Sequence, residues 1–244
     1  MKVAPWIVLL ALQEPKHFDP AVHEATKTFA YEDFLIVPVR VHVLQSKADD
    51  TLHCRLEEKD VRRIFGKINR IWNMAGIALR IESVLKEDAL TPDGFDGSKA
   101  PAEEFRKTRP AETRPAGMIH VYYIHRLTMN GIYLGGDAIF VKDTAALREV
   151  KGGVDEPIPR VTSHEMGHAF SLPHRQDTIN LMASGTTGWS LNDAEAAAAR
   201  AWASKQPWVL TPAQAFEKKQ FDILADLPGE SGLKAKAREA LGQK

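Results

Sequence analysis

Apolar residues recur along the first part of the chain in two different periods. Over residues 34–44 apolar and more polar positions alternate, which predicts a strand with one face more buried than the other. Over residues 56–74 the apolar positions are three and four residues apart, which predicts an amphipathic helix that Gly76 ends. The alternation returns over residues 77–84. The order strand, helix, strand favours a crossover connection and parallel pairing of the two strands.

Shorter elements follow a long loop at residues 86–116, which contains four prolines. Further strands are predicted at residues 118–124, 131–134 and 138–141. Further helices are predicted at residues 160–172 and 191–203. Pro173 is expected to end the first of these helices, and Ser190 to cap the second, with Asp193 three residues on. Thr211 and Pro212 open another predicted helix near the C-terminus.

Composition is that of an ordinary globular protein and excludes some classes of partner. The chain has 244 residues, of which 44% are hydrophobic, enough to bury a sizeable core. The 32 Lys and Arg residues balance 32 Asp and Glu residues, so bulk attraction to nucleic acid or to an anionic membrane is excluded. Because Cys54 is the single cysteine, neither an intramolecular disulfide nor a multi-thiolate metal site can form. Any metal must therefore be bound by nitrogen and oxygen.

Residues 1–33 are predicted to be a lead-in segment. Val3–Leu12 is an apolar run behind Lys2 that is too short to span a bilayer and about as long as a signal-peptide core. It lacks a small-x-small cleavage site and Pro5 interrupts it, so two alternatives stay open: an export signal, and an apolar segment packed on the domain. An export signal here would make the protein secreted or extracytoplasmic, and the lead-in segment could alternatively be a pro-segment. No transmembrane segment is predicted elsewhere.

The sequence HEMGH, an HExxH motif, places His164 and His168 four residues apart on a predicted helix. Because a helical turn has 3.6 residues, both imidazoles leave the same face and can converge on one ion. Glu165 lies about 100° around the helix, where it reaches a metal-activated water without being a ligand. His174 follows just past Pro173, where a turn can bring it under the same metal. The alternative is a surface helix with solvated histidines.

The pattern HExxHxxSxxH over residues 164–174 resembles the metzincin signature, and Met182 resembles the Met-turn methionine of that clan of zinc metallopeptidases. Residues 134–140 (LGGDAIF) are similar to a matrixin segment, which makes the pattern matrixin-like. The resemblance implies one catalytic Zn²⁺ with Glu165 as general base, and Met182 as a structural floor beneath the metal. The implied zinc ligands are His164, His168 and His174.

The resemblance also implies the architecture. The fold class would be α/β (α+β), with a twisted mixed sheet of about five strands, an antiparallel edge strand, backing and active-site helices, and a smaller C-terminal lobe. The catalytic domain would span residues 34–210, with its upper lobe ending at about residue 174, and residues 211–244 would be a helical tail. A peptide or protein substrate would pair in extended form with the edge strand. The residues implied for this contact are Gly131, Ile132, Tyr133 and Leu134.

Several positions depart from the family pattern. Ser171 replaces a glycine, where a left-handed backbone costs about 1 kcal/mol. Ile139 stands where matrixins have a structural-zinc histidine, and Ser184 where astacins and serralysins have a tyrosine, so neither a second zinc nor a tyrosine switch is predicted. Cys54 is interpreted as a partly exposed thiol and not as a latency cap. Trp189 is either a wall of the primed-side pocket or a core residue.

The predicted function is that of a zinc-dependent endopeptidase in which Glu165 deprotonates the metal-activated water. Two alternatives stay open. A gluzincin-type hydrolase would use Glu195 as third ligand, and a non-catalytic zinc-binding protein would use the metal only to hold its lower lobe together. Substrate preference and oligomeric state are not predicted.

Overall fold

The chain is described from a computed structural model over residues 28–243. Residues 1–27, with the apolar run Val3–Leu12, and residue 244 lie outside the described part. The alternatives for the lead-in segment therefore stay open. Within residues 28–243, no helix has the length and apolar character that crossing a membrane requires.

Five strands form one mixed sheet in the order β2-β1-β3-β5-β4. Their bounds are β1 Leu35–Gln45, β2 Ile77–Asp88, β3 Ile119–Ile124, β4 Gly131–Tyr133 and β5 Ala138–Lys142. The first four in this spatial order are parallel, whereas β4 runs antiparallel to β5 at the edge. Every residue of the central strand β3 is buried, as expected for a strand covered on both faces. The predicted fold class, with its antiparallel edge strand, is confirmed.

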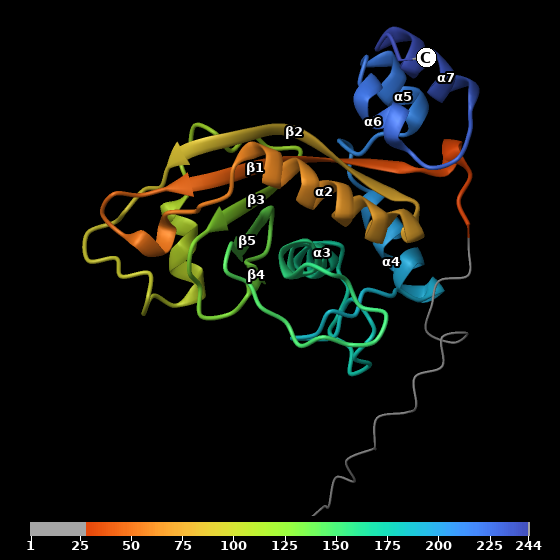
Figure 1. Cartoon of the computed structure of the whole chain (residues 1–244). Helices are drawn as coiled ribbons and strands as arrows, with labels where there is room; N and C mark the ends of the chain where they lie inside the picture. The colour runs from red at the N-terminus through yellow and green to blue at the C-terminus, as the bar shows by residue number, and fades with distance from the viewer. Residues whose placement is uncertain (1–27, 244) are drawn as a thin grey trace, which may run out of the picture.

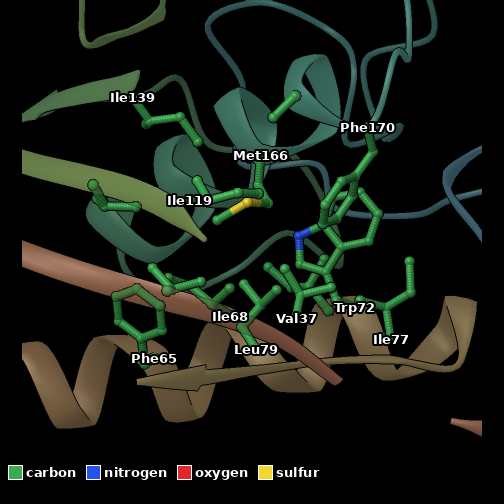
Figure 2. Close-up of a cluster of buried hydrophobic side chains, with 14 of the residues drawn as sticks. Val37, Phe65, Ile68, Trp72, Ile77, Leu79, Ile119, Ile139, Met166 and Phe170 are labelled. Carbon is green, nitrogen blue, oxygen red and sulfur yellow. The ribbon is translucent and has the colours of Figure 1, made fainter. Parts of the chain in front are cut away.

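Helices α2 (Glu58–Trp72) and α3 (Pro157–Ala169) share one hydrophobic core with the sheet (Figure 1). Val37 of β1, Phe65 of α2 and Phe170 after α3 are among the side chains that meet there (Figure 2). Full burial of such a side chain contributes about 1.5–3 kcal/mol. The core therefore fixes α3, the helix that carries the HExxH motif, against the sheet.

The bounds predicted for α3 are wrong at both ends. The helix begins at Pro157, which supplies a suitable φ at the first turn, and not at residue 160. It ends at Ala169 because Ser171 adopts a left-handed φ of 67°. There Ser171 N donates to His168 O at 2.9 Å and Leu172 N donates to Gly167 O at 2.9 Å, so Pro173 is not the terminator.

The predicted cap of the next helix, α4 (Asp193–Ala203), is also displaced. Asn192 is the N-cap, and its side chain accepts a hydrogen bond from Glu195 N at 2.9 Å. The Glu195 carboxylate in turn accepts from Asn192 N at 2.9 Å, which completes a capping box. The pattern of a cap and an acid three residues on is present, but it lies two residues after Ser190.

The opposite face of the sheet is covered by the segment predicted as a loop. β2 extends to Asp88 because it pairs with β1 as far as Gln45. Residues Ala102–Thr108 form a 3₁₀ helix whose Phe105 packs edge-on against Phe140. This segment thus completes the second layer of the sheet.

Three short helices follow α4 and pack with the start of the described chain. They are α5 Pro212–Glu217, α6 Phe221–Asp226 and α7 Gly232–Ala240. Tyr31, Phe34 and Ile36 join them in a second hydrophobic cluster. Figure 1 shows these helices beside the beginning of β1, at the other end of the sheet from β4.

Candidate metal centre

Three histidine nitrogens converge at the C-terminal half of α3. Nε2 of His164 lies 3.2 Å from Nε2 of His168 and 3.2 Å from Nε2 of His174. The remaining pair, His168 and His174, is separated by 3.1 Å. Within residues 28–243 this is the one group of three or more His, Cys, Asp or Glu side chains arranged to hold a metal ion. The structure therefore brings together the three histidines that the sequence pointed to.

Backbone carbonyls fix the tautomers of two of these imidazoles. Nδ1 of His164 lies 2.8 Å from Leu181 O, and Nδ1 of His168 lies 2.9 Å from Leu172 O. Since a carbonyl only accepts, each Nδ1 carries the proton and each Nε2 presents its lone pair. Burial lowers the pKa of His164 to about 3 and also lowers the pKa of His168, so both rings are neutral. Neutral imidazole nitrogens are donors that Zn²⁺ accepts readily.

The spacing of the nitrogens also fits zinc. A tetrahedral site with zinc–nitrogen bonds of about 2.0–2.1 Å requires its ligand atoms to be about 3.3 Å apart. The three Nε2 separations of 3.1–3.2 Å meet that requirement closely. Three histidines leave a fourth position open, as in a catalytic zinc site.

Glu165 lies beside the histidines with its carboxylate directed at strand β4. The side chain is only 7% exposed, and Oε2 accepts a hydrogen bond from Tyr133 N at 2.8 Å. Burial raises the pKa of Glu165 to about 7, although the Tyr133 hydrogen bond and the charge of Arg160 oppose this change. A carboxyl group with a pKa near neutrality is suited to both taking and returning a proton.

Strand β4 turns its free edge toward α3. Leu134 N donates to Ala138 O at 2.9 Å and Lys142 N donates to Asn130 O at 3.0 Å, so residues 130 and 134 face β5. Because hydrogen-bonding directions alternate along a strand, the backbone groups of Gly131 and Tyr133 face away from β5. The bond from Tyr133 N to Glu165 agrees with this direction.

A cleft with a volume of about 580 Å³ runs between β4 and α3. Gly131, Ile132 and Tyr133 line it together with the three histidines and Glu165, whereas Leu134 does not. The volume falls in the range of small-molecule and peptide side-chain sites, about 300–1,000 Å³. Of the four residues implied for substrate contact, three therefore line this cleft, and the contact itself stays a prediction.

Gly131 allows β4 and α3 to approach closely. A Cβ atom at this position would lie 2.6 Å from Val161 Cγ1 and 3.0 Å from Glu165 Cγ. These distances are below normal van der Waals contact, so glycine is needed here for lack of a side chain and not for its backbone freedom. The role of Gly131 in this close approach was not predicted. In the sequence, the only indication of it is the presence of a glycine at this position.

Met182 lies beneath α3 in a tightly bonded turn. Its side chain is fully buried, and a Cβ atom at Gly167 would collide with its sulfur. Met182 N donates to Asn180 Oδ1 at 2.7 Å, and Met182 O accepts from Arg175 N at 3.0 Å. The turn is thus pressed against the residue that precedes His168, while the assignment of Met182 as a floor for the metal stays a prediction.

Glu195 holds this turn and does not join the histidines. Its Oε2 accepts hydrogen bonds from Asn180 Nδ2 at 2.8 Å and from Asn192 N at 2.9 Å. Its Oε1 lies 3.3 Å from Arg175 Nε, an ion pair without hydrogen-bond geometry. Since the group of described residues that can hold a metal contains no carboxylate, nothing in it supports Glu195 as a third ligand.

The structure corrects the interpretation of Cys54 and favours one of the two alternatives for Trp189. Cys54 is buried and not partly exposed, and burial raises the pKa of its thiol to about 12, so a reactive thiolate is not available there. Trp189 packs on the main core and donates from Nε1 to Gly152 O at 2.8 Å. It does not line the described cleft, which favours the core alternative for this residue.

Replacing Ser171 with glycine is expected to raise the free energy of unfolding by about 1 kcal/mol, because the left-handed φ of 67° is free of strain for glycine. Urea denaturation of the zinc-loaded variant measures the change. Lys219 is a matched site, with a φ of 57°, and Lys219→Gly is expected to give a similar gain. A loss of stability in Ser171→Gly alone would mean that the serine side chain outweighs the strain.

Comparisons with known proteins give a fold similarity and nothing closer. No family model matches the chain, and no curated protein matches it. The solved structure of an archaemetzincin from Methanopyrus kandleri is 13% identical, with 69% of this chain and 96% of that chain covered and a TM-score of 0.48. Metalloproteinase-II from Bacteroides fragilis is 10% identical over 74% of this chain and 56% of that chain, with a TM-score of 0.43. A zinc-dependent peptidase from Methanocorpusculum labreanum is 14% identical over 68% of this chain and 99% of that chain, with a TM-score of 0.35.

Proposed function

We propose that this protein is a zinc-dependent peptidase of the metzincin clan that hydrolyses internal bonds of extended peptides. The observation that carries the proposal is the meeting of three elements in one cleft. These are three histidine Nε2 atoms 3.1–3.2 Å apart, a buried carboxylate, and the free edge of a β-strand. The matrixin-like affiliation stays a prediction.

His164, His168 and His174 would hold the metal ion. A zinc ion there supplies a Lewis acid for the peptide carbonyl and lowers the pKa of a water molecule toward neutrality. The carbonyls of Leu181 and Leu172 keep two of the rings in the tautomer that presents Nε2. The Met182 turn, bonded to Arg175 and Asn180, supports the helix from below.

Glu165 would act as the general base and then as the general acid. Tyr133 N–H holds its Oε2, which leaves Oε1 to take a proton from the attacking water and return it to the leaving amine. Burial between β4 and α3 keeps bulk water from competing for the carboxylate. The hydrogen bond to Tyr133 also restricts the rotamer, so the carboxylate is positioned before substrate arrives.

The peptide would lie along β4. Gly131 and Tyr133 carry outward backbone groups, and Tyr133 O and both groups of Gly131 are left to pair with an added strand. Main-chain pairing needs no chain terminus, which is why an internal bond is the proposed target. Ile132 and the half-exposed Met129 add apolar contact surface in the cleft.

The test is cleavage of a mixed peptide library by the full chain, with zinc stoichiometry measured on the same preparation. One zinc per chain and cleavage that chelation removes are expected. His174→Ala should lose the zinc, whereas Glu195→Ala should keep it despite lower stability. Zinc binding without any cleavage would leave the non-catalytic zinc protein as the function. Loss of zinc only in Glu195→Ala would establish the gluzincin-type ligand set.

A further inference from the structure

Arg160 is a buried cation in the wall of the cleft. It precedes His164 by four residues on α3, so the two side chains leave the same face of the helix. Arg160 lines the cleft, yet its side chain is only 1% exposed. A guanidinium so deeply buried needs acceptors for its five N–H groups.

The loop after the histidines supplies some of these acceptors. Nε donates to Gly188 O at 2.8 Å, and Nη2 donates to Asn180 O at 3.3 Å and to Ala183 O. Nη1 makes no hydrogen bond to residues 28–243. Some buried side-chain nitrogens of the described residues have neither a hydrogen-bond partner nor contact with solvent, and Nη1 is not one of them. Nη1 is therefore the part of Arg160 that the cleft can reach.

No carboxylate within residues 28–243 forms an ion pair with this cation. Among the described residues Glu165 is the one acid whose charge acts on Arg160, and it forms no ion pair with it. Burial lowers the pKa of Arg160 to about 10, which reflects the cost of holding the charge there. A second cation, Lys142, lines the cleft where β4 begins, and no acid other than Glu165 does so.

Arg160 and Lys142 line the cleft from different elements, α3 and β5, and the Lys142 ammonium donates to Leu127 O at 3.3 Å. Lys142 N bonds Asn130 O, next to Gly131, and Gly131 is the residue against which Val161 packs. Val161 follows Arg160 directly on α3. The cleft therefore has a cationic end at Arg160, which lies beyond His164 along α3, on the far side from His168.

We propose that this cationic end binds the side-chain carboxylate of an Asp or Glu residue in the peptide substrate, with Arg160 as the specificity-determining residue. The proposal rests on the proposed peptidase function. A carboxylate would supply the acceptor that Nη1 lacks, as a charge-assisted hydrogen bond in a desolvated site. The bonds to Gly188, Asn180 and Ala183 give Arg160 a structural role as well, but that role uses only Nε and Nη2.

The position of Arg160 restricts where the acidic residue lies in the peptide. Arg160 lies four positions before His164 on α3, a rise of about 6 Å along the helix. An extended peptide advances about 3.3 Å per residue. The recognised acid is therefore within two residues of the cleaved bond, on the side of Arg160.

Pairs of peptides test the proposed acid preference. The two members of a pair are identical except that one has Glu and the other Gln at a single position. That position is varied over the two residues on each side of a bond that the enzyme cleaves. At one of these positions, the kcat/KM of the zinc-loaded protein for the Glu peptide is expected to be at least about tenfold higher than for the Gln peptide. Equal rates at all four positions overturn the proposal. If no library peptide is cleaved at all, the peptidase function itself fails, which is a different result.

Substitutions of arginine test whether Arg160 is the residue that causes the preference for Glu over Gln. Arg160→Met is expected to reduce the Glu/Gln ratio to near one. Arg200 is the matched control because it also binds three carbonyls, those of Ala75, Gly76 and Asp33, outside the described cleft. Arg200→Met is expected to keep the ratio, and zinc content and thermal denaturation report folding of both variants. A folded, zinc-loaded Arg160→Met that retains the full preference overturns the assignment. If Arg160→Met does not fold, the wild-type protein still tests the acid preference. A Glu/Gln ratio near one at all four positions overturns the proposal, and a ratio of about tenfold or more at one position supports it.

Discussion

Replacing Glu165 with glutamine is expected to lower kcat/KM for peptide cleavage by about 10²–10⁴-fold, the usual contribution of a general base. Glutamine has nearly the same shape, and its amide oxygen can still accept the hydrogen bond from Tyr133 N. It cannot take a proton from water at neutral pH. The loss should therefore fall on kcat, with little change in KM.

Zinc content and stability separate this effect from damage to the fold. Glu165 is outside the group of three histidines, so one zinc per chain is expected in Glu165→Gln. Since burying a carboxylate costs more than burying a neutral amide, the variant should unfold at the same temperature as the wild type or at a higher one. Full activity in a zinc-loaded variant would exclude Glu165 as the base.

The sequence predicted those features that depend on local spacing. The apolar period of α2 and the alternation of β1 each extend over more than ten residues, and both elements form close to their predicted bounds. His164 and His168 share a helical face because of their spacing alone. His174 lies only six residues further on, so a single turn brings it to the same point.

The features that the sequence did not predict depend on contacts between distant segments. His42 and His120 lie 2.9 Å apart, Nε2 to Nδ1, because β1 and β3 pair in a register that places Arg40 opposite His120. Neither residue has ligand spacing along the chain. The acceptors of Arg160 are likewise 20 to 28 residues away, so its burial follows from how the loop after Met182 folds back.

The ends of α3 show a second limit. Periodicity locates the middle of a helix, but its end depends on one residue adopting a left-handed backbone, and serine does so rarely. Ser171 adopts it because the following turn returns toward His174 and Leu172 O bonds His168 Nδ1. The turn that brings His174 to His164 and His168 thus overrides the intrinsic preference of that residue.

Replacing Gly131 with alanine is expected to lower kcat by about 10²-fold, because a displacement of about 1 Å in a catalytic group has that effect. The new Cβ would lie 2.6 Å from Val161 Cγ1 and 3.2 Å from Glu165 Oε1, so α3 or the Glu165 side chain must shift. A shift of the rigid helix moves His164 and His168 together with it. Zinc binding should therefore persist while the relation between Glu165 and β4 is lost.

Gly66 provides the control for Gly131→Ala. It lies on the exposed side of α2, and a Cβ atom there would meet nothing within 4 Å. Gly66→Ala should leave kcat unchanged and raise the free energy of unfolding by up to about 1 kcal/mol through helix propensity. Steady-state kinetics with zinc analysis on both variants distinguish the outcomes. If Gly131→Ala retained wild-type kcat, the close approach of β4 to α3 would have no part in positioning Glu165, and the edge strand would serve the substrate alone.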